Sequence, residues 1–160
     1  MSLFDLTFIK QKANIIFLGP PGVGKTHLAV ALAVKACHAG LSIYSTTMDE
    51  LVKKLKMDHE DDRSGKSRHY YKSALVLIDE VGYTALNREE CNLFFKFVGN
   101  RYEKASTIIT SNKSFSDWTE LFYDPIIITA ILDRLLHHSV VINIQGESYR
   151  MKKKLVKGGD

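Results

Sequence analysis

The sequence predicts an α/β fold in which helices cover both faces of a five-stranded parallel sheet. Short apolar runs of strand length alternate with longer segments of helical pattern along the 160 residues, and this order is typical of parallel strands joined by helical crossovers. The run Asn14–Leu18 also leads through a glycine-rich stretch, GPPGVGKT, into an Ala-rich segment, which is a strand, a loop and a helix in succession. We expect one domain, because a chain of this length that is 45% apolar can bury one substantial core.

The first half of the chain predicts two strands, each followed by a helix. The run NIIFL is short, β-branched and aromatic, as expected of a buried strand. The Ala-rich segment after the loop precedes Gly40, where a helix commonly stops, and Thr47 is placed to cap the second helix. The predicted elements are strand Asn14–Leu18, helix Lys25–Ala39, strand Ser42–Thr46 and helix Met48–Lys56.

The second half predicts three strands and two helices. Asn87 with Glu90 three places later has the sequence of a capping box. Asp124 before Pro125 is an N-cap followed by a first-turn proline, so we expect a helix there in spite of the strand propensity of IIIT. The predicted elements are strand Leu75–Ile78, helix Asn87–Tyr102, strand Ser106–Thr110, helix Asp124–His138 and strand Val140–Ile144. The charged stretch Met57–Lys72 receives no assignment.

The stretch Gly19–Thr26 fits the phosphate-binding motif G-x-x-x-x-G-K-[ST] in full. Gly22 and Gly24 let the backbone turn its N–H groups inward, at a helix N-terminus that favours anions. Lys25 can reach the β and γ phosphates, and the Thr26 hydroxyl can ligate Mg²⁺. The alternative is a simple glycine turn with a capping threonine. The predicted nucleotide-binding residues are Gly19, Pro20, Pro21, Gly22, Val23, Gly24, Lys25, Thr26 and His27.

The stretch ALVLIDEVGY (Ala74–Tyr83) places two carboxylates directly after a run that is fit for burial. Ionised carboxylates at such a position need a cation. The carboxyl ends of parallel strands share one edge of a sheet, so Asp79 is expected to hold the Mg²⁺ shell near the phosphate loop. Glu80 is then placed to orient and deprotonate an attacking water. The alternative is that Glu80 only caps the following loop.

Asn112 follows the fourth predicted strand and can hydrogen-bond the attacking water or the γ phosphate. A turn-forming asparagine is the alternative. A strand intervenes in sequence between the phosphate-loop strand and the Asp79 strand, and an acid stands at the position of Glu80. This pattern is similar to the division of nucleoside triphosphatases that carries an inserted strand, hydrolyses ATP and acts on macromolecules.

The composition argues against a disulfide-stabilised, a metal-binding and a membrane protein. Cys37 and Cys91 are too few for a disulfide framework, so we expect two buried free thiols. His137 and His138 are adjacent in a predicted helix and should point about 100° apart, which argues against a shared metal. No apolar run is long enough to span a bilayer and no secretory signal is visible, so a soluble, cytoplasmic protein is expected. The net charge is +4.

Four stretches together resemble the ATPase core of the IstB family of transposition helper proteins. They are FLGPPGVGKTHLAVAL, LVLIDEVGY, STIITSNKSFSDW and AILDRLLHHSVVINIQGESYR. This family is close to the DnaC-type helicase loaders within the AAA+ superfamily of P-loop NTPases. The resemblance implies a three-layer ASCE sandwich with strand order 5-1-4-3-2. We expect a single AAA+ core over residues 1–160, which departs from the family pattern in lacking an N-terminal helical region and a C-terminal lid.

The resemblance also implies roles for individual residues. The match covers Gly24, Lys25 and Thr26 in the nucleotide motif, Asp79 and Glu80 in the acidic motif, and Asn112 as the first sensor. Arg134 in LDRLL matches the arginine finger that completes a neighbouring subunit's site. The alternative is a helix-surface arginine paired with nearby acids. Arg101 is a further candidate for an interface cation.

The implied function is an ATP- and Mg²⁺-dependent ATPase that forms a homo-oligomer, binds DNA and assists a transposase. A DnaC-like replicative helicase loader is one alternative, and a non-hydrolysing, ATP-dependent assembly module is another. The charged stretch Asp58–Lys72 and the tail Arg150–Lys157 are the candidate DNA contacts, although a solvated tail is the commoner reading of such a charge cluster.

Overall fold

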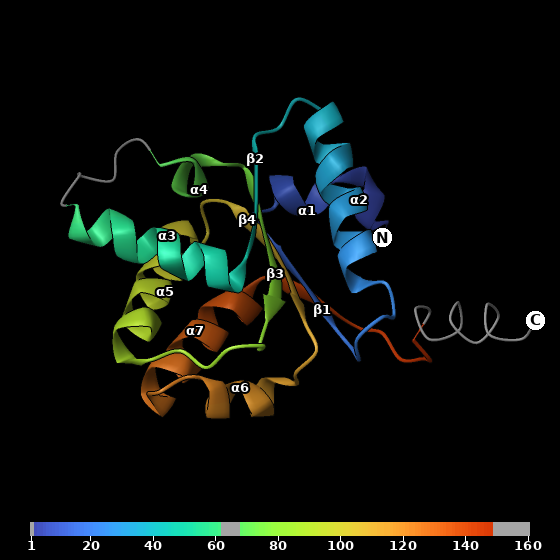
Figure 1. The fold of residues 1–160 in the computed structure, drawn as a ribbon. Coiled ribbons are helices and arrows are strands. Elements are labelled where there is room, and N and C mark those ends of the chain that lie inside the picture. The colour runs from blue at the N-terminus through green and yellow to red at the C-terminus, as the bar shows by residue number, and fades with distance from the viewer. Residues whose placement is uncertain (1, 62–67, 149–160) are drawn as a thin grey trace, which may run out of the picture.

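A five-stranded parallel sheet forms the middle layer of the fold (Figure 1). The computed structural model describes residues 2–61 and 68–148. The strands are β1 Asn14–Leu18, β2 Ile43–Thr47, β3 Leu75–Val81, β4 Ser106–Ser111 and β5 Ser139–Asn143. They lie in the order β2-β3-β4-β1-β5 and every neighbouring pair is parallel, which confirms the predicted order. β4 therefore lies between the strand that enters the phosphate loop and the strand that carries the two acids.

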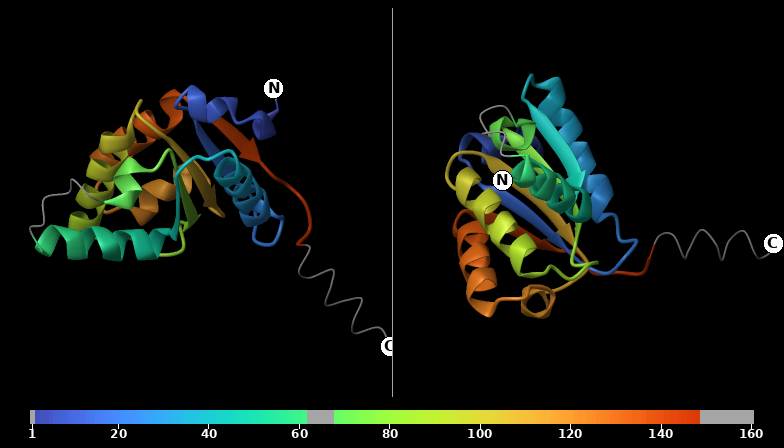
Figure 2. Two further views of the ribbon diagram at one scale, coloured as in Figure 1. Left: turned by 90° about the horizontal axis from the view of Figure 1, so that it is seen from above. Right: turned by 60° about the vertical axis from the view of Figure 1, so that its left-hand side comes forward.

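Helices cover the sheet in two groups on opposite faces, as both ribbon figures show (Figures 1 and 2). One group is the 3-10 helix η1 Leu3–Asp5 with α1 Thr7–Lys10 and α2 Lys25–His38. The other group is α3 Met48–Glu60, α4 His69–Lys72, α5 Arg88–Arg101, α6 Phe115–Leu121 and α7 Pro125–His137. The predicted three-layer architecture is confirmed.

Each central strand contributes to both cores. Ile15 and Phe17 of β1 pack in the core under α2, whereas Ile16 and Leu18 pack in the core under α3, α5 and α7. Successive side chains of a strand point to opposite faces of the sheet. A strand that is covered on both faces buries the side chains on both of them, which accounts for the uninterrupted apolar run IIFL after Asn14.

The predicted helix starts are confirmed by their caps. The Thr47 hydroxyl accepts from the Glu50 N–H at 3.2 Å, and the Asn87 side chain accepts from the Glu90 N–H at 2.9 Å, each within a full capping box. Asp124 accepts from the N–H of Ile126 at 2.8 Å, and Pro125 occupies the first helical position. These caps satisfy N–H groups that have no partner inside a helix.

Several elements differ from the prediction. α3 continues to Glu60, where an i,i+4 ion pair between Lys54 and Asp58 at 3.3 Å supports the extra turn. β3 continues to Val81 through an irregularity in its pairing with β4. η1, α1, α4 and α6 were not predicted. Of the two candidate DNA contacts, residues 62–67 of the first and all of Arg150–Lys157 lie outside the described residues.

Arg101 is a structural residue of the core, so its interpretation as an interface cation is wrong. Its side chain is 3% exposed. Nη1 donates to the carbonyls of Tyr70 at 3.0 Å and Ser73 at 2.9 Å, and Nη2 donates to Ser106 O at 2.6 Å. Burial lowers the pKa of Arg101 to about 10. The guanidinium thereby ties the end of α5 to the segments that lead into β3 and β4.

The two cysteines have different surroundings. Cys91 is buried, as predicted, and burial raises the pKa of its thiol. Cys37 is exposed on α2, so the prediction of a second buried thiol is wrong. Within residues 2–61 and 68–148, no helix has the length and apolar character needed to cross a membrane.

Candidate nucleotide-binding site

The phosphate loop joins β1 to α2 and depends on positive backbone angles. Gly22 has φ 81°, and Gly24, the N-cap of α2, has φ 97°. Residues with a Cβ rarely adopt such positive φ angles. A Cβ on Gly22 would also clash with the Ser148 hydroxyl. The segment after β5 therefore lies directly against the loop, and the Ile144 N–H donates to Leu18 O at 2.7 Å beside it.

Lys25 is the first residue of α2 and is buried, with 9% exposure. Its ammonium lies back over the loop and donates to Pro20 O at 2.7 Å. An ammonium has three donors on a flexible stem. The same group can therefore hold the loop closed on itself and donate to phosphate oxygens that enter the loop.

Asp79 lies beside the loop. The Thr26 hydroxyl donates to Asp79 at 3.0 Å (Oδ1) and 3.3 Å (Oδ2), and the Thr110 hydroxyl also donates to Oδ1. A hydroxyl and a carboxylate that meet in this way are the hard oxygen donors that Mg²⁺ prefers. The donor set of Thr26 and Asp79 thus fits the predicted metal. Glu80, the next residue, is exposed.

These groups share one cleft, which has a volume of about 310 Å³. Its lining comprises Pro21, Gly22, Val23, Gly24, Lys25, Thr26, His27, Asp79, Glu80, Tyr83, Thr110, Ser111 and Asn112. Gly19 and Pro20 belong to the loop but do not line the cleft. The volume falls within the range of about 300–1,000 Å³ that is common for ligand pockets.

Asn112 brings an unsatisfied polar atom to this cleft. Its side-chain Oδ1 is buried and has no hydrogen-bond partner among the described residues. A buried polar atom without a partner is costly in a folded protein. A water bound in the cleft can donate to this oxygen, and the Nδ2 group of the same amide can donate to a phosphate oxygen.

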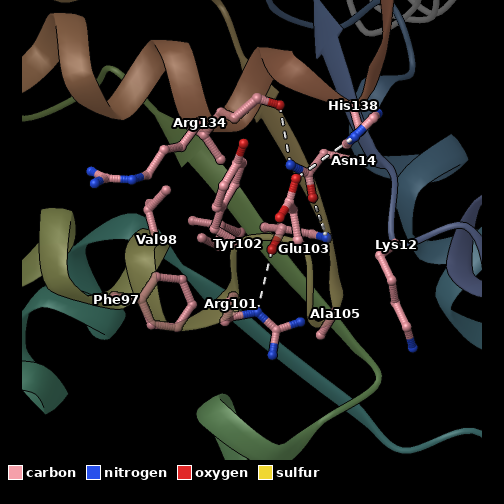
Figure 3. A pocket seen from close by; sticks show the side chains of 13 residues that line it. Lys12, Asn14, Phe97, Val98, Arg101, Tyr102, Glu103, Ala105, Arg134 and His138 are labelled. Atoms are coloured by element: carbon pink, nitrogen blue, oxygen red, sulfur yellow. Dashed lines mark hydrogen bonds and ion pairs between the residues drawn. The ribbon is translucent and has the colours of Figure 1, made fainter.

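Arg134 lies away from the cleft of its own chain. It lines a separate pocket between α5, α7 and the sheet, and its guanidinium lies over the Phe95 ring, 4.4 Å from the ring centre. Figure 3 shows the guanidinium turned away from Arg101 in the same pocket. Arg134 Nη1 is buried without a hydrogen-bond partner, and Arg134 forms no salt bridge with any described residue. Its pairing with nearby acids, the alternative interpretation, is absent from the described structure.

His137 and His138 do not point apart, so the prediction that they do is wrong; it assumed that both residues are helical. α7 ends at His137, and His138 leaves the helix with φ −125° and ψ 85°. The two rings are therefore 4.2 Å apart, and together with Glu103 they offer three ligand atoms within 4.8 Å of one another. All three side chains are more than half exposed, at 51%, 56% and 55%, and we assign no ion to them.

Sequence reasoning missed Thr110, Ser111 and Tyr83, which also line the cleft. Thr110 and Ser111 end β4 next to Asn112, so their position beside the acids followed from the predicted strand order. No motif marks them, since Thr and Ser are ordinary strand and turn residues.

The order of the parallel strands and the glycine-rich loop after β1 define the chain as a protein with a P-loop nucleotide-binding fold. The crystal structure of the DnaC helicase loader matches it with a TM-score of 0.72 and 24% identity, over 89% of this chain and 86% of that one. AMPPCP-bound DnaA from Aquifex aeolicus matches with a TM-score of 0.71 and 20% identity, over 97% of this chain and 50% of that one. At these identities the similarity concerns the fold.

The chain belongs to the family of IstB-like ATP binding proteins, whose model matches residues 1–157. It is 52% identical over 157 residues to a Pseudomonas aeruginosa protein named for insertion sequence IS21 and for ATP binding, covering 98% of this chain and 59% of that protein. It is 45% identical over 153 residues to the counterpart named for IS5376 in Geobacillus stearothermophilus, covering 95% of this chain and 61% of that protein. The chain thus spans about three fifths of the length of these relatives.

Proposed function

We propose that this chain is an ATPase core that binds ATP with Mg²⁺, hydrolyses the ATP and assists a transposase on DNA. The observation that carries the proposal is the single cleft in which Thr26, from the phosphate loop, hydrogen-bonds Asp79, from β3. A triphosphate held by the loop would place its γ phosphate beside the acid pair. Both halves of the proposed hydrolysis site therefore line one pocket.

In this proposal each residue has a separate task. The loop N–H groups and Lys25 bind the phosphates, while Thr26 and Asp79 would hold Mg²⁺, which would supply positive charge to neutralise the phosphates. Glu80 accepts a proton from the attacking water as the general base. Asn112 donates to that water or to the γ phosphate.

Arg134 acts in trans. Its guanidinium lies outside its own cleft and carries a buried, unpaired Nη1, and charge that develops on the transferring phosphoryl group is stabilised by an arginine from outside. We therefore propose a homo-oligomer, formed with ATP, in which Arg134 completes the cleft of the next subunit.

The proposed role as a partner of a transposase on DNA rests on the names of the relatives, which refer to insertion sequences. We place the protein in the cytoplasm.

The experiment that tests hydrolysis compares Glu80→Gln with the wild type. The variant keeps every proposed phosphate and metal contact, so it should bind ATP with unchanged affinity and lose hydrolysis by about a hundredfold or more. Glu89→Gln is the matched control, because Glu89 is an exposed carboxylate in the first turn of α5, outside the cleft. Unchanged phosphate release by Glu80→Gln would remove Glu80 as the base.

The same assays separate the alternatives. A non-hydrolysing assembly module would bind ATP but release no phosphate, with or without DNA. A replicative helicase loader would retain a helicase rather than a transposase in a pull-down from purified components. The transposition role predicts phosphate release that responds to DNA and retention of the transposase.

A further inference from the structure

The pairing of β3 with β4 contains one extra residue at the acid pair. Ile78 lies opposite Ile109, but Val81 lies opposite Ser111, so Asp79 and Glu80 together face a single residue, Thr110. Two residues against one is the arrangement of a β-bulge, which often re-aims side chains next to functional sites. Here the two bulged residues are the ones proposed to hold the metal and the water.

The bulge places Glu80 in a backbone conformation that is unfavourable for it. Glu80 has φ 63°, in the left-handed region that residues with a Cβ rarely occupy. Such conformations persist only where the surrounding structure holds them. The group that faces this backbone is the side chain of Thr110, which is 2% exposed.

One hydroxyl serves both bulged residues. The Glu80 N–H donates to Thr110 Oγ1 at 3.0 Å, and Thr110 Oγ1 in turn donates to Asp79 Oδ1. A hydroxyl has one proton to donate and can accept at the same time. Thr110 therefore satisfies the amide that the bulge removes from the strand ladder, and it fixes the carboxylate that also accepts from Thr26.

We infer that Thr110 is a positioning residue for ATP hydrolysis, acting through Asp79 and Glu80 and not on the nucleotide itself. The inference rests on the proposed function, since it concerns the same cleft. Without the hydroxyl, the Glu80 amide has no partner and the backbone is free to leave the left-handed region. The Glu80 carboxylate then swings away from the attacking water, and the Asp79 carboxylate loses one of the two hydroxyls that orient it.

The test uses two substitutions in the full chain. Thr110→Val has nearly the same shape and no hydroxyl, whereas Thr110→Ser keeps the hydroxyl. Thr110→Val should lower the kcat for ATP hydrolysis by about tenfold to a hundredfold, while the KM for ATP changes much less. It should also raise the Mg²⁺ concentration needed for half-maximal ATP binding. Thr110→Ser should keep both the kcat and the Mg²⁺ requirement close to their wild-type values.

Thr107→Val is the matched control. Thr107 is buried on the same strand at 4% exposure, and its oxygen accepts from Arg101 Nε at 3.4 Å, outside the cleft. A general loss of stability from removing a buried hydroxyl of β4 appears in both valine variants as a lower midpoint of thermal unfolding. Only Thr110→Val should change kcat and the Mg²⁺ requirement.

Hydrogen exchange of the Glu80 amide, followed by NMR without nucleotide, tests the positioning step by itself. The amide should be protected in the wild type and in Thr110→Ser, and it should exchange at least about tenfold faster in Thr110→Val. Equal exchange in all three proteins overturns the inference, whatever the activity. Wild-type kcat in Thr110→Val, or no recovery in Thr110→Ser, overturns it as well. A wild type that hydrolyses no ATP overturns the proposed function instead, and the exchange result still decides the role of Thr110.

Discussion

Among single residues, Gly22 shows most directly how the phosphate loop limits the side chains it can hold. Its φ of 81° suits glycine, and a Cβ there would clash with the Ser148 hydroxyl. Two independent constraints thus exclude a Cβ at Gly22: the positive φ of its backbone and the nearby Ser148 hydroxyl. A substitution must either move the loop or displace the segment after β5.

We predict that Gly22→Ala weakens ATP binding by about tenfold or more and lowers the free energy of unfolding by about 1–3 kcal/mol, because the loop must adopt a strained conformation. The matched control is Gly99→Ala in α5, where nothing lies within 4 Å of the added Cβ. That change should stabilise the protein by about 0.5–1 kcal/mol. Titration with ATP and urea unfolding measure the two effects. Wild-type affinity in Gly22→Ala would contradict the constraint.

For pairs of elements, Asp58 links the end of α3 to α4. Its Oδ2 accepts from the Tyr70 hydroxyl at 2.6 Å and lies 3.5 Å from Arg68 Nε, and its Oδ1 lies 3.3 Å from Lys54 Nζ. Burial raises the pKa of the Asp58 carboxyl, but these partners outweigh burial and hold the pKa below its ordinary value of 3.8. Burial and the same hydrogen bond raise the pKa of Tyr70.

We predict that this link fails in acid. Because the folded state holds the pKa of Asp58 below the unfolded value, its contribution to stability is complete above about pH 4 and is lost as the pH falls through the lowered pKa. Tyr70→Phe should cost about 1–2 kcal/mol at pH 7, and this cost should shrink below pH 4.

Urea unfolding of the wild type and the variant across pH 2–7 measures the difference. Tyr44→Phe is the control, since Tyr44 packs edge-on against Tyr70 but hydrogen-bonds no carboxylate among the described residues. A Tyr70→Phe cost that stays constant with pH would show that Asp58 is not the group being titrated.

The elements that could be predicted are those whose signals are local. The caps at Thr47, Asn87 and Asp124 mark helix starts in sequence, and the structure places helices there. α6 begins with an equally local capping box, Ser114 with Asp117, but a helix of seven residues offers too short a periodic pattern to be recognised. The extension of β3 to Val81 depends on its register against β4, which no stretch of sequence displays.

For the molecule as a whole, the strand order could be predicted because the motifs specify a known arrangement, and the cleft follows from it. Lys25, Thr26, Asp79, Glu80 and Asn112 were named from the sequence and do line one cleft. Thr110 was not, because its role arises from facing two residues across the bulge. Arg101 was misassigned because its charge was visible in sequence and its burial was not.

At the scale of the assembly, we predict complementation between two inactive variants. Arg134→Ala should lower hydrolysis by about a thousandfold or more, and Lys25→Ala should abolish it. Mixed in equal amounts, they should regain about a quarter of the wild-type rate, because about one interface in four then joins an intact loop to an intact arginine. Phosphate release across mixing ratios measures this.

The control mixes Arg88→Ala with Lys25→Ala, since Arg88 is an exposed arginine at the start of α5. That mixture should only lose activity in proportion to the inactive protein added. If Arg134→Ala and Lys25→Ala both fold and assemble but regain nothing together, Arg134 does not act in trans.

The contact between Ser148 and the phosphate loop has a mechanical consequence. β5 is an edge strand, and the chain leaves it by running along the loop from Ile144 to Ser148. Any force on the chain beyond this point reaches the loop after a few residues, without passing through the rest of the sheet. We therefore expect a partner that binds the chain beyond Ser148 and displaces it to change the affinity of the phosphate loop for the triphosphate.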